Sequence, residues 1–266
     1  MIKVTKSSEP QILTDNKTQW TNDLMNLVKK YGSYNKIPEG EKTAAIKYYA
    51  HPDIKAALLG HSGKAKCIYC ESYVNVSGYA NIEHYHPKSI KPNETFSWDN
   101  LFVGCTACNT PKNNFDTSKE PFIHPVNDNP EDYLTFDELM YKPKFDTGTS
   151  YLKAKNVIEK CDLWRTPLIR EHANILCAFL ETRKAIIATI IHYNGAKTDK
   201  TRVEDAQTIL NSLTLLNSEA SDDDHYAGYM RYLLRKYGEI RDAVNIVNSH
   251  KDNLGIPSGF QWGFTF

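Results

Sequence analysis

An acid and two histidines crowd into four positions of this sequence, between two Cys-x-x-Cys pairs. The segment "IEHYHPK" (82–88) carries Glu83, His84 and His86. An imidazole can act as a base near neutral pH, and a carboxylate is a ligand for hard divalent cations. If the cysteines hold one ion and this segment serves a second, the pattern indicates a metal-dependent nuclease. If all these residues share a single zinc ion, the pattern indicates only a structural knuckle.

The cysteine pairs have the spacing of a zinc site. They are Cys67, Cys70, Cys105 and Cys108, with 34 residues between the pairs. Four thiolates complete a tetrahedral Zn²⁺ site and leave no position open for water, so we predict a structural zinc. Such a site contributes on the order of 10–16 kcal/mol of apparent binding energy to folding. The acid–histidine segment then needs a separate explanation.

Short secondary-structure elements must position these side chains. "YANIEHYHP" is typical of a short strand stopped by Pro87, and at strand spacing His84 and His86 share a face. Downstream, "GCTACNTPKNNF" places Asn109 directly after the last cysteine and Lys112 three residues later. If a helix starts at that cysteine pair, Asn109 and Lys112 lie on one face of it.

The combined pattern "CIYC…IEHYHPKS…WDNL…CTACNTPK" resembles the zinc-anchored HNH endonucleases. Within that group it is most similar to the PtuB-like nuclease subunits of Septu anti-phage defence and their retron-associated relatives. The resemblance covers roughly residues 48–140. It implies an α+β fold, in which a small zinc-anchored ββα-metal core is flanked by N-terminal and C-terminal α-helical regions.

The resemblance also implies roles for individual residues. His84 would be the general base that activates a water, and Glu83 and Asn109 would bind a catalytic Mg²⁺ or Mn²⁺. Asn100 would hold a loop over the site. His86 would contact the scissile phosphate or complete the metal site. The alternative for His86 is a strand histidine bonded to a backbone carbonyl.

Contacts to nucleic acid must come from a local patch, because the formal net charge of the chain is zero and its pI is about 7.1. Lys88 and Lys112 are the predicted phosphate contacts, with Lys91 as a further candidate. Such contacts add salt-dependent affinity without sequence specificity. For Lys88 and Lys91 the alternative is an ordinary solvated surface.

Composition divides the 266 residues into three regions. Residues 1–63 and 131–266 show apolar positions at helical spacing, and we expect helix in both. Residues 64–130 hold four cysteines, several prolines and short apolar runs, which is typical of a small core stapled by metal. We predict an N-terminal helical region, an HNH core and a C-terminal helical domain that binds a partner.

Several functions fit these observations. The leading hypothesis is an HNH endonuclease that cuts DNA as the effector of an anti-phage system, with an ABC-type, PtuA-like ATPase as its partner. One alternative is a zinc-stabilised nucleic-acid-binding or scaffold subunit without catalysis of its own. Another is an effector of a retron system that cleaves RNA such as tRNA. A homing-type or restriction HNH enzyme working alone would need an added specificity domain, and the neutral helical remainder offers no obvious one.

The sequence also suggests where the protein acts. It has no Gly-x-x-x-x-Gly-Lys-Ser/Thr loop for ATP, so any energy coupling must come from another subunit. The polar start lacks the apolar run of a signal peptide, and no stretch approaches the roughly 18 apolar residues of a membrane span. We therefore expect a cytoplasmic protein without membrane association.

Cys161 and Cys177 are expected to be buried as small apolar side chains.

Overall fold

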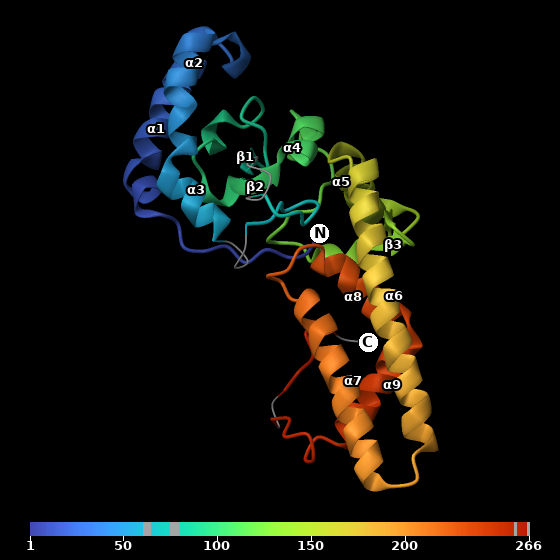
Figure 1. Ribbon diagram of the computed structural model, residues 1–266. Helices are drawn as coiled ribbons and strands as arrows, with labels where there is room; N and C mark the ends of the chain where they lie inside the picture. The colour runs from blue at the N-terminus through green and yellow to red at the C-terminus, as the bar shows by residue number, and fades with distance from the viewer. Residues whose placement is uncertain (61–64, 75–79, 258–259, 265–266) are drawn as a thin grey trace. The chain divides into compact units, whose positions relative to one another are not determined.

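The computed structural model describes residues 1–60, 65–74, 80–257 and 260–264. These residues form two compact units, Met1–Arg165 and Thr166–Phe266 (Figure 1). The first unit contains small sheets and helices together, whereas the regular elements of the second unit are helices. This mixed architecture, with a four-cysteine cluster in the first unit, confirms the α+β class that the sequence predicts.

The first unit is built from five helices and two small hairpins among its described residues. Its helices are α1 (Gln11–Tyr31), α2 (Glu39–Ile46), α3 (Pro52–Leu59), α4 (Thr106–Lys112) and α5 (Gly148–Lys160). Its strands are β1 (Ala80–His84), β2 (Leu101–Cys105), β3 (Leu134–Asp137) and β4 (Met140–Pro143). Short 3-10 turns join several of these elements, and the one at Tyr34–Lys36 connects α1 to α2.

The N-terminal helices follow the expected signals. Helix α1 ends at Gly32, whose φ of 81° is left-handed and therefore suits glycine. Helix α3 begins with Pro52 in its first turn, where a missing N–H costs nothing. Leu13 and Leu24 are buried on α1 at helical spacing, and Ile54 is buried on α3.

The central hairpin pairs β1 with β2 in antiparallel register, with Glu83 opposite Phe102 and His84 opposite Leu101. Helix α4 follows β2 directly, so the chain order is strand, strand, helix (Figure 1). The buried face of β2 includes Leu101, Phe102 and Val103. Strand β1 thus ends with Glu83 and His84. Strand β2 ends at Cys105, where the chain continues into helix α4 with Cys108.

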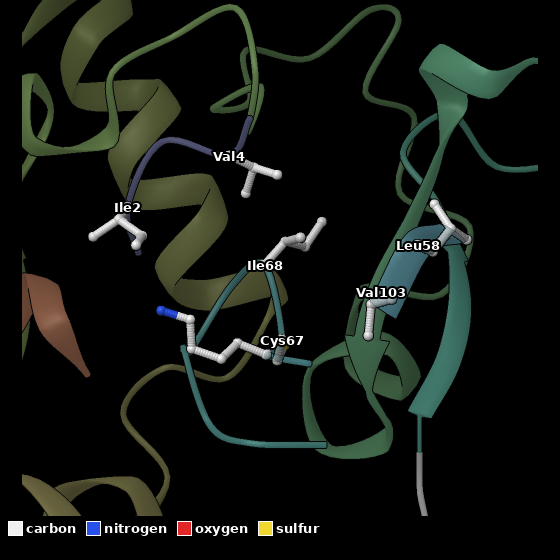
Figure 2. A pocket seen from close by; sticks show the side chains of 7 residues that line it. Ile2, Val4, Leu58, Cys67, Ile68 and Val103 are labelled. Atoms are coloured by element: carbon white, nitrogen blue, oxygen red, sulfur yellow. The ribbon is translucent and has the colours of Figure 1, made fainter. Parts of the chain in front are cut away.

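The N-terminal segment packs against the first cysteine pair and β2. Ile2 and Val4 line a small apolar cavity of about 20 Å³ together with Leu58, Ile68 and Val103 (Figure 2). The backbone of Val4 also donates a 2.8 Å hydrogen bond to the carbonyl of Pro125. Cys67 lines the same cavity, so the N-terminal segment packs next to the first cysteine pair.

A second hairpin lies where helix was expected. Strands β3 and β4 pair antiparallel over Leu134–Asp137 and Met140–Pro143, so the expectation of helix from residue 131 is wrong there. Leu134, Phe136 and Tyr141 are buried, and the rings of Phe136 and Tyr141 lie 4.5 Å apart. Alternating burial of this kind stabilises strands rather than a helix.

The compact units divide at a different place from the three sequence regions. Helix α5 packs against β4 and α4, which keeps residues up to Arg165 in the first unit. The boundaries at 63/64 and 130/131 stay a prediction about domains.

The second unit consists of four helices among its described residues, and α7 packs against both α6 and α9. They are α6 (Thr166–Gly195), α7 (Asp199–Glu219), α8 (Ala227–Lys236) and α9 (Gly238–Ser249). Helices α8 and α9 are separate, because Tyr237 is extended and Gly238 starts a new helix. Cys161 is buried as expected, whereas Cys177 is exposed on α6. Across the described residues, none of the helices has the length and apolar character of a membrane span.

Candidate active site

The four cysteines meet in one cluster. The Sγ atoms of Cys67, Cys70, Cys105 and Cys108 all lie within 4.8 Å of one another. A Zn–S bond of about 2.3 Å in a tetrahedron implies sulfur–sulfur distances of roughly 3.8 Å. The distance between the Cys70 and Cys105 sulfurs is 3.7 Å. The cluster therefore has the ligands and the spacing that a tetrahedral zinc ion requires.

Backbone hydrogen bonds shape the first cysteine turn. The N–H of Cys67 donates to the carbonyl of Ser72 at 2.9 Å, and the N–H of Glu71 donates back to Cys67. Ile68 donates to the carbonyl of Val103 at 3.0 Å, which ties this turn to β2. The turn is thus fastened to the strand that carries the second pair of cysteines.

The second cysteine turn opens helix α4 and has a cation beside it. Cys105 is the residue before the helix, and Cys108 lies in its first turn. The guanidinium of Arg165 donates to the sulfur of Cys108 at 3.4 Å. A thiolate cluster carries negative charge, which this arginine offsets. Arg165 was not predicted, because it lies 57 residues after Cys108 and no motif around it indicates this contact.

His84 lies at the end of β1 with its ring buried. One ring nitrogen, Nε2, is 3.0 Å from the carbonyl of Thr95. A carbonyl can only accept, so Nε2 carries the proton and Nδ1 holds the lone pair, which faces the ammonium of Lys88. Burial, followed by the nearby charge of Lys88, holds the pKa of His84 well below its usual range. The imidazole is therefore neutral at physiological pH and basic at Nδ1.

Glu83 is buried beside a cation. Its Oε1 accepts a hydrogen bond from the hydroxyl of Tyr69 at 3.1 Å and lies 2.5 Å from the ammonium of Lys112. Burial raises the pKa of the Glu83 carboxyl, and the charge of Lys112 acts in the opposite direction. Both contacts use Oε1. This arrangement leaves Oε2 as the carboxylate oxygen available for a metal ion.

Lys112 is buried, whereas a contact with phosphate requires an exposed side chain. Its side chain is 1% exposed, and its ammonium donates to the carbonyl of His84 at 3.0 Å in addition to pairing with Glu83. In this structure Lys112 therefore braces the end of β1 from inside the protein. The predicted contact of Lys112 with nucleic acid has no support in this geometry.

Asn109 and Glu83 approach each other across Gly104. A Cβ built on Gly104 would lie 3.2 Å from the Cβ of Glu83 and 3.7 Å from that of Asn109. Among the described residues, no hydrogen bond engages the side-chain amide of Asn109. One carboxylate oxygen and one amide oxygen next to a missing side chain are suitable ligands for a Mg²⁺ or Mn²⁺ ion that keeps several waters.

A cavity of about 450 Å³ brings these groups together. Glu83, His84, Lys88 and Asn109 all line it. The ammonium of Lys88 lies 3.5 Å from Nδ1 of His84 and 4.4 Å from the ring centroid of Tyr49. Burial lowers the pKa of Lys88. Lys88 is therefore the predicted phosphate contact that the structure places beside the candidate base.

Asn100 ties together the two ends of the loop that leaves β1. Its Oδ1 accepts from the N–H of His86 at 2.6 Å. Its Nδ2 donates to the carbonyls of His86 and Glu94 at 3.0 and 3.1 Å. The segment between these residues includes Lys88 and leads to Thr95, which holds His84. Asn100 thus joins His86 to Glu94, and its role in holding this loop over the site stays a prediction.

His86 is separated from this group. The strand β1 ends at His84, so strand alternation does not place the two histidines on one face. The Nδ1 of His86 is 2.7 Å from the hydroxyl of Thr117, and Nε2 is 4.0 Å from the carboxylate of Glu94. His86 is not among the residues that line the cavity. Its predicted role at the phosphate or the metal remains a prediction.

The site also includes residues that the sequence analysis missed. Tyr69 donates a hydrogen bond to Glu83, and the carbonyl of Thr95 contacts the ring of His84. Neither residue was predicted from the motif to hold a site residue. The cavity is further lined by Tyr34, Asn35, Asn113 and Asn114. The paired asparagines after Lys112 were a visible signal in "PKNNF". Tyr34 and Asn35 lie far away in sequence and carried no signal.

Comparison with known proteins agrees with this geometry. Residues 67–115 match the family model of the HNH endonucleases, so the chain carries an HNH endonuclease domain. The matched segment runs from the first cysteine pair through β1, β2 and α4, and it includes the whole Glu83, His84 and Asn109 group.

Two curated relatives are similar over longer stretches, and both are named Septu protein PtuB. The protein from Bacillus thuringiensis is 38% identical over 97 residues, which cover 36% of this chain and 37% of the relative. The protein from Bacillus mycoides (strain KBAB4) is 27% identical over 209 residues, which cover 66% of this chain and 67% of the relative. The first match thus spans little more than a third of that relative's length.

Proposed function

We propose that this chain is a metal-dependent endonuclease that hydrolyses phosphodiester bonds in DNA. The observation that carries the proposal is the convergence of Glu83, His84 and Asn109 on one cavity beside a closed four-cysteine cluster. A scaffold needs the cysteines for stability but does not need a buried acid, a neutral histidine and a free amide around one opening.

The chemistry assigns a task to each side chain. The oxygen of a water molecule forms a bond to phosphorus, and the P–O bond to the leaving oxygen breaks. A base takes the proton that this water loses. His84 takes that proton at Nδ1, because Thr95 fixes the other ring nitrogen as a donor. Glu83 and Asn109 would hold a divalent ion, which would supply positive charge near the scissile phosphate and the leaving oxygen.

Neighbouring residues keep these groups in position. Tyr69 and Lys112 hold one oxygen of Glu83, so the other oxygen keeps a fixed direction. Lys88 binds a phosphate oxygen at the mouth of the cavity. Asn100 holds the loop that carries Lys88. Because these supports are already formed, little reorganisation is needed when the substrate arrives.

We further propose that the chain acts in Septu-type anti-phage defence with an ABC-type ATPase subunit as its partner. The names of the two relatives support the system, and the sequence has no ATP-binding loop, which supports a separate source of energy. Helix α6 carries exposed apolar side chains such as Leu180 and Ile191, which suits a binding surface for another protein.

The test of the nuclease proposal is cleavage by the zinc-loaded chain with and without its ATPase. Matched DNA and RNA substrates are incubated with EDTA, Mg²⁺ or Mn²⁺. We expect cleavage of DNA that requires the added ion and survives in the variant Cys177→Ser, which lies outside the cluster. Cleavage of RNA alone would contradict the proposed polymer. Absence of cleavage under every condition, with the partner present, would leave the non-catalytic scaffold as the better account.

A further inference from the structure

The cavity over the HNH domain has a second wall that the domain itself does not provide. Glu83, His84 and Asn109, which line it, lie within the matched residues 67–115. Tyr34 and Asn35, from the turn between α1 and α2, line it as well. The N-terminal helical region therefore takes part in the site and does more than cover the core.

The turn that presents Tyr34 is held at both ends. Before it, Gly32 adopts a φ of 81° and ends α1. Within it, the N–H of Lys36 donates to the carbonyl of Ser33, and the N–H of Ile37 donates to that of Tyr34. Ile37 is 2% exposed and anchors the turn in the core. The wall is therefore a fixed surface that presents Tyr34 and Asn35.

Further lining residues come from the end of helix α4 and the segment after it. Asn113 and Asn114 line the cavity together with Asn109. The hydroxyl of Ser89 donates to Asn114 Oδ1 at 2.8 Å, which links this segment to the loop after β1. Asn113 has a positive φ of 43°, a backbone conformation that residues with a side chain rarely adopt. The lining thus combines one aromatic ring with several neutral amides.

This lining matches the chemistry of an unpaired nucleotide. Any base can stack on an aromatic ring, and amides can hydrogen-bond base edges that pairing would otherwise occupy. Burial, with Tyr49 and Glu39 adding to it, raises the pKa of Tyr34 to about 12, so its phenol is neutral and does not repel phosphate. Lys36 is exposed next to this wall and suits a phosphate on the neighbouring nucleotide.

The size of the cavity suits a single unpaired nucleotide. A volume of about 450 Å³ lies within the range of roughly 300–1,000 Å³ that encloses one small ligand. A single strand with its base turned onto Tyr34 would bring its phosphate towards His84, because both residues line the same cavity.

We propose that the Tyr34–Asn35 turn is a binding wall that selects unpaired nucleic acid and stacks the base next to the scissile phosphate on Tyr34. This inference rests on the proposed nuclease function and adds a substrate class to it. DNA and RNA share the recognised features, so both single strands bind the wall.

The test measures binding in the full chain with His84→Ala, which prevents cleavage during the experiment. Fluorescence anisotropy is recorded for labelled 12-nucleotide single strands of DNA and RNA and for the matching duplex. We expect the single strands to bind at least about tenfold more tightly than the duplex. Adding Tyr34→Ala should weaken single-strand binding about tenfold, within the range measured for one stacked base. Tyr34→Phe, which keeps the ring, should restore it.

The control is Tyr48→Ala, which removes an exposed tyrosine of the same helical region that does not line the cavity. Duplex binding as tight as single-strand binding, or no effect of Tyr34→Ala, would overturn the inference. Cleavage by the protein with His84 intact separates the two ideas. If duplex is cut and Tyr34→Ala changes nothing, only the inference fails. If no polymer is bound or cut with the partner present, the nuclease function fails as well.

Discussion

At the scale of single residues, the site depends on a buried charge pair. Glu83 and Lys112 lie 2.5 Å apart, and both side chains are less than 5% exposed. Two charges of opposite sign are tolerated inside a protein when each satisfies the other. Removing one partner leaves the other unpaired in a medium that solvates it poorly. The pair therefore links the stability of the hairpin to the geometry of the metal ligand.

We predict that Lys112→Met lowers the free energy of unfolding by about 3–5 kcal/mol, because it leaves the Glu83 carboxylate buried without its cation. Urea unfolding followed by tryptophan fluorescence measures this loss. Adding Glu83→Gln should recover much of it, because the unpaired charge is then removed. Lys119→Met is the surface control, since its side chain is 81% exposed. A coupling energy near zero in this double-mutant cycle would contradict the pairing.

Gly104 gives a second prediction at this scale. In Gly104→Ala the new Cβ would lie 3.2 Å from the Cβ of Glu83, so the acid must shift by a few tenths of an ångström. We expect the cleavage rate to fall about tenfold or more, because small displacements of catalytic groups are costly. Gly40→Ala is the matched control, because nothing lies within 4 Å of its added Cβ. Equal rates for both variants would show that the position of Glu83 is not critical.

At the scale of elements, the sequence was informative where local patterns decide the structure. The stop of α1 at Gly32 and the start of α3 at Pro52 follow from backbone chemistry and were predictable. The hairpin of β3 and β4 was not, because its ten residues gain their stability from the packing of alternate side chains. The break at Tyr237 between α8 and α9 depends likewise on tertiary context.

The same distinction applies to the candidate site. Local spacing was enough to find the four cysteines and the segment from Glu83 to His86. The burial of Lys112 and the approach of Tyr34 depend on how distant segments pack, so no local pattern could reveal them. His86 shows the limit clearly, since a strand two residues longer would have placed it beside His84.

Lys6 provides a pH prediction for the segment that packs on β2. Its ammonium donates to the carbonyl of Leu101 at 2.9 Å and lies 4.2 Å from the ring centroid of Phe102. Burial lowers the pKa of Lys6 to about 8 from 10.5, while Asp99 and Glu9 act in the opposite direction. Between these two pH values the unfolded chain binds a proton that the folded chain lacks. The contribution of Lys6 to stability therefore rises with pH across this interval.

The measurement compares the wild type with Lys6→Met by urea unfolding from pH 7 to 10.5. The difference in unfolding free energy, wild type minus variant, should rise as the pH passes from about 8 to 10.5. Other groups titrate in both proteins, so their effects cancel in the difference. A difference that stays flat or falls over this range would contradict the buried environment of Lys6.

At the scale of the whole molecule, the two compact units have different sources of stability. The unit Met1–Arg165 contains the cysteine cluster, whereas the described helices of Thr166–Phe266 pack through apolar side chains such as Phe179 and Leu213. A metal that binds only the folded state contributes its binding energy to folding. Zinc should therefore matter for the first unit alone.

We predict that a strong chelator removes about one zinc ion per chain and exposes the first unit to hydrogen exchange, while helices α6–α9 stay protected. Hydrogen exchange read by mass spectrometry resolves the two units. The variant Cys105→Ser should lose most of its zinc. Cys177→Ser should keep it, because Cys177 is exposed on α6 and lies outside the cluster. Simultaneous loss of protection in both units would contradict this division.

The central claim is that His84 is the base of a metal-dependent nuclease site, and a single-turnover cleavage assay tests it most directly. His84→Ala and His86→Ala are compared at saturating Mg²⁺ or Mn²⁺, with the zinc content of each protein measured first. The account predicts that His84→Ala lowers the rate at least about a hundredfold, in the range of general-base catalysis, while His86→Ala costs much less. An unchanged rate in a zinc-loaded His84→Ala protein would contradict the account.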